Sequence, residues 1–264
     1  MVHLFMKDNT KGNKLLYFSY GVCAFFLGIP IISLFLSPWV KAVKSLGDTL
    51  VIHAILISFK STFCSLIIIL LFGLPTAYVM ARCSFSGKRF LEPIFDLPLV
   101  LPPAVAGLLL LITFGRKGII GKYLYFLGMQ IPFSFIAVVM AQIFGSASIF
   151  IKSAKNGFQQ VDKDLEITAA TLGDTPWQVF KRVTLPLSWN GILTGAVMAW
   201  ARSLAEFGAT IMFAGNLLGK TQTLPLAIYT AMEKDMNLSM AIAVVLVVIS
   251  LGILVLLKEI SIKS

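Results

Sequence analysis

The chain has 264 residues, of which 58% are hydrophobic and only 13% are charged, and its mean hydropathy is +0.89. Soluble domains are typically about 45–50% apolar and about 25% charged, so the composition excludes an ordinary soluble protein and is typical of a membrane protein. The 22 Lys and Arg outnumber the 12 Asp and Glu. Because these bases stand at the ends of apolar runs, they indicate membrane topology signals and no nucleic-acid partner.

Six apolar segments are long enough to cross a hydrocarbon core about 30 Å thick, which takes about 20 helical residues. The first run exceeds the roughly 7–15 apolar residues of a signal peptide and has no clean small-residue cleavage site, so we expect an uncleaved anchor. The sequence therefore predicts an all-α membrane protein, with six transmembrane helices in one domain over residues 1–264. The helices are expected at 15–40, 50–81, 95–114, 132–151, 189–214 and 238–257.

The distribution of basic residues predicts the orientation in the membrane. With six spans, both termini lie on one side, and the loops of that side carry thirteen Lys and Arg against seven on the other. An excess of Lys and Arg marks the cytoplasmic side. We therefore expect a multi-pass protein of the cell membrane with cytoplasmic termini and a cytoplasmic loop at about 152–188.

That loop carries the capping signals of two short helices. Asp162 places an acid at the start of the first helix, where the helix dipole favours it, and Gly173 is suited to end it. Asp174 or Thr175 can then cap a second helix that has Pro176 in its first turn. The second helix is predicted to lead into the fifth span.

The first of these helices has a face of small residues. Thr168, Ala169 and Ala170 would let another surface approach closely, while Leu165 and Leu172 share a face with Ala169 at helical spacing. One alternative is a helix that lies on the membrane surface, but the apolar face is weak and the polar face is not basic. A helix that binds in a groove of a soluble partner fits better.

The same loop resembles the EAA loop of ABC importer permeases, which has a Glu, alanines, a Gly, and then a β-branched residue, Leu and Pro. Two departures are mild: Thr168 replaces the first Ala of many members, and Gly173 follows Glu166 by seven residues instead of six. The resemblance implies a type I ABC importer permease fold with a cytoplasmic coupling helix that binds an ATP-hydrolysing subunit. The coupling residues it implies are Glu166, Thr168, Ala169, Ala170, Gly173, Val183, Leu185 and Pro186.

No residue set predicts an active site or a metal site in this chain. The segment 214–221 fits a loose phosphate-loop pattern, but it follows an apolar helix where a nucleotide site requires a strand. The two histidines are isolated, and the three cysteines lie in or next to apolar runs without paired spacing. We therefore expect no bound cofactor, no metal and no enzymatic activity, with ATP used by a partner chain.

The fifth span contains two charged residues. Arg202 lies near mid-membrane, where a charge normally faces a bundle interior or an aqueous path, and Glu206 follows four residues later. Two interpretations stay open and are compatible: an ion pair that holds helices together, and a lining or gate of a pathway for a polar solute. Gly208 and Ala209 would let a neighbouring helix approach closely.

Prolines at the third span predict a kinked or unwound segment, because proline breaks helical hydrogen bonds. Such a segment must pack against protein, and it could also move. The candidate residues for a translocation pathway or gate are Arg202, Glu206, Gly208, Thr210, Asn216, Pro102 and Pro103.

Four segments, 97–107, the EAA loop, 201–216 and 221–229, together resemble the molybdate/tungstate permease subunits of ABC importers, over about residues 58–256. The resemblance implies a permease that moves a tetrahedral oxyanion by alternating access. It also implies a homodimer in the lipid bilayer, two ATP-binding-cassette subunits and an extracytoplasmic oxyanion-binding protein.

Three other functions compete with this one. Sulfate/thiosulfate permeases are close relatives that share the segment at 206–216. An ion-gradient-driven secondary transporter would favour inverted repeats and more acids within spans. A membrane enzyme would need a convergent set of catalytic side chains. The coupling loop favours the ABC importer.

Overall fold

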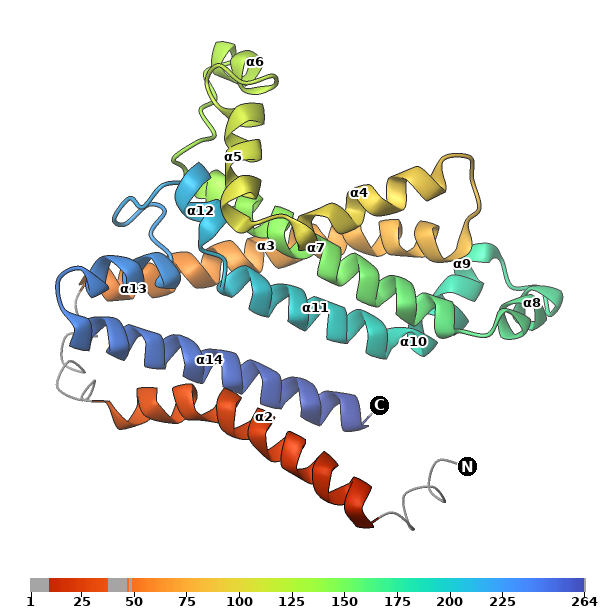
Figure 1. Ribbon diagram of the computed structural model, residues 1–264. Helices are drawn as coiled ribbons and strands as arrows, with labels where there is room; N and C mark the ends of the chain where they lie inside the picture. The colour runs from red at the N-terminus through yellow and green to blue at the C-terminus, as the bar shows by residue number, and fades with distance from the viewer. Residues whose placement is uncertain (1–9, 38–46, 48, 264) are drawn as a thin grey trace.

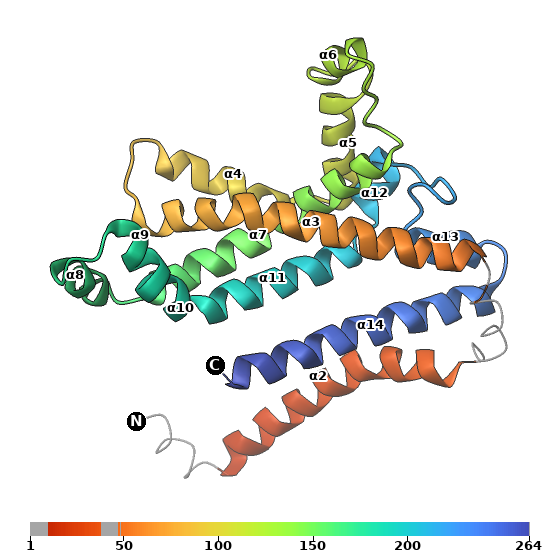
Figure 2. The same ribbon diagram turned by 180° about the vertical axis from the view of Figure 1, so that it is seen from behind.

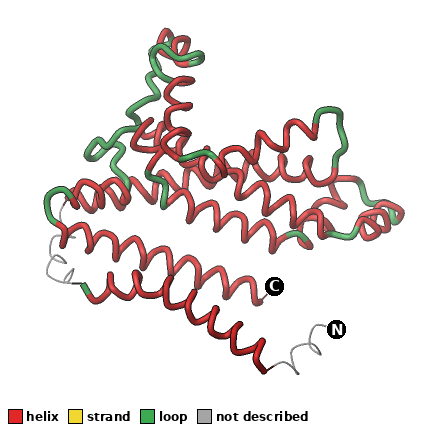
Figure 3. The backbone as a smooth tube through the Cα atoms, in the orientation of Figure 1, coloured by secondary structure: helices red, strands yellow, loops and turns green. Residues whose placement is uncertain are grey.

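The computed structural model describes residues 10–37, 47 and 49–263. Within these residues every regular element is a helix and no strand occurs, as Figure 3 shows, so the all-α prediction is confirmed. The helices are α2 Thr10–Leu36, α3 Thr49–Arg82, α4 Lys88–Val100, α5 Pro103–Phe114, α6 Gly121–Phe126, α7 Phe135–Gln160, α8 Lys163–Thr171, α9 Pro176–Val179, the π-helix η2 Phe180–Thr184, α10 Leu185–Leu187, α11 Trp189–Leu204, α12 Gly208–Phe213, α13 Leu224–Met232 and α14 Met236–Lys263.

Three long helices, α3, α7 and α11, form the centre of the molecule, and small residues let them pack closely. A Cβ atom on Gly191 of α11 would lie 2.6 Å from Cα of Gly157 in α7, so the two backbones are in contact. Gly73 of α3 leaves the same kind of space for the ring of Phe150, which is fully buried. Close approach at small residues is how membrane helices gain packing energy where lipid offers no hydrophobic drive.

Helices α14 and α2 form a separate layer on one side of this centre, with α2 outermost (Figures 1 and 2). The apolar segment Leu16–Leu36 of α2 is 0% buried within the chain. The first residues of α2 and the last residues of α14 lie at the same end of the molecule as α8 in both views. The short helix α13 lies at the opposite end.

Four described helices are long and apolar enough to cross a membrane: Leu16–Leu36, Thr49–Arg82, Phe135–Gln160 and Met236–Val255. The pair α4 and α5 makes a fifth candidate, bent by 118° at the break between them. The chain is thus a multi-pass membrane protein, while the count of six spans stays a prediction.

Three of the predicted segments differ most from the structure. The segment 189–214 is not one helix, because α11 ends at Leu204 and α12 begins at Gly208. Helix α7 runs on to Gln160, so the polar loop begins at 161 and not at 152; the extra turns are stabilised by burial of Phe158 and by ion pairs to α4. The third segment already begins at Lys88 and bends before Pro103. The prediction for 38–40 lies outside the described residues.

Candidate functional site

The loop between α7 and α11 folds through the predicted caps. Asp162 accepts a hydrogen bond from the backbone N–H of Asp164 at 3.0 Å and starts α8. Gly173 follows the end of α8 with φ +98°, a left-handed conformation that favours glycine. Thr175 and Gln178 form a capping box at α9, with a proline in its first turn. The two predicted short helices are therefore confirmed.

Glu166 of α8 contacts its own chain. Its Oε1 accepts hydrogen bonds from Nη2 of Arg82 at 3.0 Å and from Oγ1 of Thr184 at 2.6 Å. Nη2 of Arg82 also donates to the carbonyl of Val161 at 2.8 Å. The side chains of Arg82 and Glu166 are only 9% and 18% exposed. Glu166 therefore joins α8 to the end of α3 and to η2, which the sequence could not show.

The other predicted coupling residues differ in their exposure to solvent. Ala169 is 8% exposed and packs within the chain, so of the three small residues only Thr168 and Ala170 face outward. The apolar face predicted with Ala169 is also divided, because Leu172 is 84% exposed and Leu165 is 50% exposed. The remaining predicted coupling residues are exposed or half-buried: Gly173, Val183, Leu185 and Pro186.

A π-helical segment, η2, connects α9 to α10 and was not predicted. Its last residue, Thr184, is buried and is the one bound by Glu166. Phe180 at its start stacks on Trp177, with ring centroids 5.5 Å apart. Single π-helical turns are often found at functional sites. Nothing in the sequence marks this turn, because it differs from an α-helix only in its hydrogen-bond register.

The charged pair at the end of α11 forms as predicted. Nη1 of Arg202 lies 2.7 Å from Oε2 of Glu206, and Oε1 of Glu206 accepts the backbone N–H of Ala209 at 2.9 Å. The Glu206 side chain is 1% exposed and the Arg202 side chain is 33% exposed. The sequence predicted that Glu206 lies on the same helix as Arg202. In the structure it lies instead in the break between α11 and α12. The pair joins two helices and still leaves part of the guanidinium accessible.

The predicted close approach beside this pair is confirmed. A Cβ atom on Gly208 would lie 2.7 Å from Cβ of Pro103, and one on Gly107 would lie 2.7 Å from the carbonyl oxygen of Ala209. The contact joins α12 to α5 immediately after the bend at Pro102. The structure therefore brings the proline bend together with the start of α12, two residues after Glu206.

Two predicted pathway residues make no side-chain hydrogen bond to the charged pair. Thr210 is fully buried, and its Oγ1 has no hydrogen-bond partner among the described residues. Asn216 donates to Oγ1 of Thr230 at 2.8 Å and accepts from Nε2 of Gln222 at 3.0 Å. The Asn216 contacts hold the loop after α12 against α13 and place no side chain next to Arg202.

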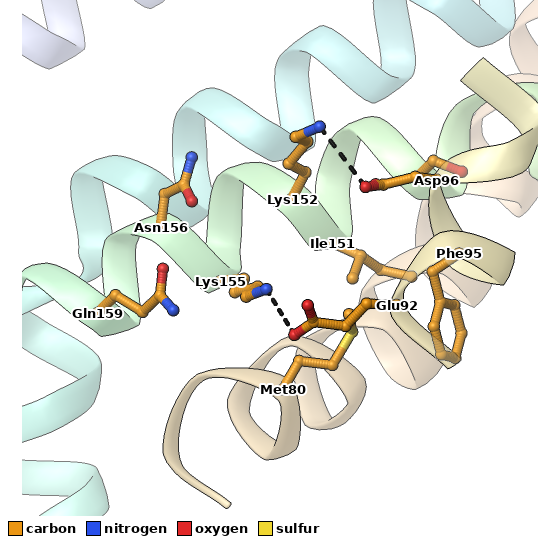
Figure 4. Close-up of a pocket in the computed structure, with 10 residues that line it drawn as sticks. Met80, Glu92, Phe95, Asp96, Ile151, Lys152, Lys155, Asn156 and Gln159 are labelled. Carbon is orange, nitrogen blue, oxygen red and sulfur yellow. Dashed lines mark hydrogen bonds and ion pairs between the residues drawn. The ribbon is translucent and has the colours of Figure 1, made fainter. Parts of the chain in front are cut away.

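A charged pocket of about 90 Å³ lies between α3, α4 and α7, and sequence reasoning missed it. Figure 4 shows two lysines of α7 reaching towards two carboxylates of α4. Nζ of Lys155 lies 2.8 Å from Oε1 of Glu92, and Nζ of Lys152 lies 3.7 Å from Oδ2 of Asp96. The sequence signal that could have indicated it is helical spacing, because the two acids are four residues apart and the two lysines are three residues apart. No group of three or more His, Cys, Asp or Glu that could hold a metal occurs in the described part of the chain.

Comparison with known proteins identifies the family of the chain. Residues 73–258 match the family described as "Binding-protein-dependent transport system inner membrane component". The molybdenum transport system permease protein ModB of Mycobacterium tuberculosis is 46% identical over 197 residues, 75% of each chain. ModB of Escherichia coli K12 is 41% identical over 206 residues, 78% of this chain and 90% of that one.

A third relative is the molybdate/tungstate transport system permease protein WtpB of Thermococcus kodakarensis, 37% identical over 237 residues, 88% of this chain and 89% of WtpB. Among solved structures, a chain of a bacterial ABC transporter that imports alginate superposes with a TM-score of 0.72 at 20% identity, over 96% of each chain. A chain of the inward-facing MetNI methionine ABC transporter superposes with a TM-score of 0.63 at 19% identity, over 81% of this chain and 95% of that one. The chain belongs to the family of binding-protein-dependent transport system inner membrane components.

Proposed function

We propose that this chain is the permease subunit of an ATP-driven importer for the tetrahedral oxyanion molybdate or tungstate. The observation that carries the proposal is the similarity, at 37–46% identity over most of the chain, to three relatives named as molybdenum or molybdate/tungstate permeases. The chain itself is not an enzyme and binds no cofactor. ATP is bound and hydrolysed by separate subunits.

The proposed assembly contains two copies of this chain in the cell membrane, two ATP-binding-cassette subunits and an extracytoplasmic oxyanion-binding protein. The exposed surface of α8 and its C-cap, at Thr168, Ala170 and Leu172, binds the ATPase. Both termini face the cytoplasm in this arrangement. The excess of Lys and Arg supports that orientation, as does the position of the start of α2 and the end of α14 at the same end of the molecule as α8.

The contacts of α8 suggest how closure of the ATPase subunits on nucleotide is transmitted to the membrane helices. Movement of α8 is passed to α3 through the Glu166–Arg82 ion pair and to η2 through the bond between Glu166 and Thr184. Helix α11 follows η2 and α10, and its 16 residues extend about 24 Å. Its far end carries Arg202, so a shift of α8 can reorient the charged pair.

Arg202 is proposed to contact the oxyanion transiently during alternating access. One guanidinium already paired with Glu206 offers few free donors, which makes a poor high-affinity site for a dianion. Weak contact suits a pathway, since the ion must leave as easily as it enters. The binding protein is therefore the component that selects the oxyanion.

Elemental analysis tests the substrate. Cells that lack this chain are grown in limiting molybdate, tungstate or sulfate, and cellular molybdenum, tungsten and sulfur are measured. Loss of molybdenum or tungsten with sulfur intact supports the proposal, whereas loss of sulfur alone assigns the chain to sulfate import. Co-purification of an ATPase subunit separates an ABC importer from an ion-gradient-driven transporter, because only the ABC importer requires that subunit.

A further inference from the structure

One face of α7 carries a series of hydrogen-bond donors that runs towards the end of the molecule where α8 lies. We name Ser148, Lys152, Lys155, Asn156 and Gln159 the donor stripe. Spacings of three and four residues place them on one helix face. Gly145, one turn earlier, is the position where a Cβ atom would lie 2.9 Å from Oε2 of Glu206. The stripe therefore begins one helical turn after the residue that lies against the Arg202–Glu206 pair.

All five residues of the donor stripe line the charged pocket between α3, α4 and α7 (Figure 4). The pocket volume of about 90 Å³ is well above the roughly 10–15 Å³ that one water molecule requires. Met80, Ile151 and Phe95 form its apolar wall. A cavity with ammonium and amide donors on one side and apolar side chains on the other has the chemistry to hold a small, compact anion.

The acidic residues of this pocket come from α4. Glu92 and Asp96, four residues apart, face Lys155 and Lys152 at 2.8 and 3.7 Å. A carboxylate is itself an oxyanion, so each acid lies where an oxygen of an anionic ligand would lie. The side chains of Lys152 and Asp96 are 58% and 51% exposed, and such exposed pairs contribute little stability. The side chains of Lys155 and Glu92 are only 20% and 35% exposed. An incoming dianion can therefore replace the Lys152–Asp96 pair at low cost, while replacing the Lys155–Glu92 pair costs more.

Helix α4 is connected so that it can move away from the donor stripe. Its end at Val100 is followed by Leu101 and Pro102, where the chain bends by 118° into α5. Proline supplies no backbone N–H, so the bend lacks the hydrogen bonds of a continuous helix. Helix α5 is held on α12 by the contacts of Gly107 and Gly208. A rotation at the bend would lift α4 from the lysines and leave α5 in place.

We propose that the donor stripe is an anion-binding exit site of the permease, and that α4 closes it with Glu92 and Asp96. The oxyanion passes from Arg202 to Lys152 and Lys155 when α4 swings away. This inference rests on the proposed function, because its ligand is the tetrahedral oxyanion that the importer carries.

The experiment uses the whole importer, with its ATPase subunits and binding protein, in proteoliposomes. Lys152→Met combined with Lys155→Met removes two charge-assisted contacts and is expected to lower molybdate uptake at least about tenfold, while the importer still assembles on gel filtration. Lys14→Met removes one exposed charge from the first turns of α2 and is the control. Uptake by the double variant equal to that of the control overturns the proposal.

A charge-swapped variant distinguishes a binding site from ion pairs that only hold α4 on α7. Glu92→Lys, Asp96→Lys, Lys152→Glu and Lys155→Glu together keep both ion pairs and remove the cations from α7. Uptake is expected to stay low in this variant although the importer assembles. Uptake restored to the wild-type level would mean that the pairs only hold α4 on α7, and the proposal fails.

Calorimetry with molybdate gives a second, direct measurement on the nucleotide-free complex of permease and ATPase. Glu92→Gln with Asp96→Asn is expected to bind molybdate more tightly than wild type, and Lys152→Met with Lys155→Met more weakly; equal binding by both overturns the site. If wild-type importer carries sulfate and not molybdate, the proposed substrate is wrong. The lysine and charge-swap variants then test the exit site with sulfate.

Discussion

Arg82 and Glu166 are 84 residues apart in sequence, yet Nη2 of Arg82 lies 3.0 Å from Oε1 of Glu166. The same carboxylate oxygen also accepts a hydrogen bond from Thr184. Glu166 is therefore bound on two sides by its own chain and offers little to a partner. Its position between the end of α3 and η2 makes it the connection through which a force on α8 reaches the membrane helices.

Glu166→Gln tests this connection. The substitution keeps the shape of the side chain but leaves the guanidinium of Arg82, 9% exposed, without its counter-charge, so we expect a loss of about 1–3 kcal/mol in stability. We also expect less substrate transported per ATP hydrolysed, measured in proteoliposomes. Asp174→Asn is the matched control, because it removes the acid of the nearby pair with Arg182, which is 65% exposed. Equal effects of the two variants would show that Glu166 has no special role.

Arg202→Ala is expected to be more destabilising than Arg202→Ala combined with Glu206→Ala. The single variant leaves a carboxylate that is 1% exposed without its partner, which costs about 3–5 kcal/mol, while the double variant removes both charges. Thermal unfolding of the purified permease measures the difference. The double variant should assemble normally but transport substrate poorly. If the double variant fails to assemble, the pair serves mainly to hold α11 and α12 together.

The sequence predicted the local features of the coupling segment well, because their causes are local. Asp162, Gly173 and Thr175 cap short helices through contacts with residues only a few positions away. The resemblance to a permease family likewise depended on short segments. The role of Glu166 could not be predicted, since its partner Arg82 is brought to it only by the packing of α3 against the rest of the fold.

The break after Leu204 illustrates why helix boundaries within the membrane were harder to predict. Leu, Ala and Glu are all good helix formers, so the local sequence favours a continuous helix across 204–206. The structure ends α11 there because Glu206 turns back to bind Arg202 and the N–H of Ala209, and because Gly208 packs on Pro103. These are tertiary contacts. The pocket between α4 and α7 could not be predicted either, because it too is formed by tertiary contacts.

Leu172→Glu tests the proposed ATPase-binding surface of α8. Leu172 is 84% exposed next to Gly173, and a charge there should prevent burial in an apolar cleft of a partner. We expect an intact permease that no longer retains ATPase subunits in a pull-down. A substitution of Gly173 is less informative, because φ of +98° strains any other residue there. Phe126→Glu, at a 90% exposed site on α6, is the control. Retention of the ATPase by Leu172→Glu would contradict the assignment of this surface.

Gly107→Ala tests the contact that holds α5 on α12. The added Cβ would lie 2.7 Å from both the carbonyl oxygen of Ala209 and Cβ of Met212, so the two helices must separate. Overpacking of this kind costs about 1–3 kcal/mol, and we expect a lower unfolding temperature for the purified permease. Gly28→Ala in α2 is the matched control, because a Cβ there meets no atom within 4 Å and alanine favours the helix by about 1 kcal/mol. Since α5 is the fixed support of the bend at Pro102, Gly107→Ala should also reduce uptake. Normal stability and uptake in Gly107→Ala would contradict the tight contact between α5 and α12 and its role as the support of the bend.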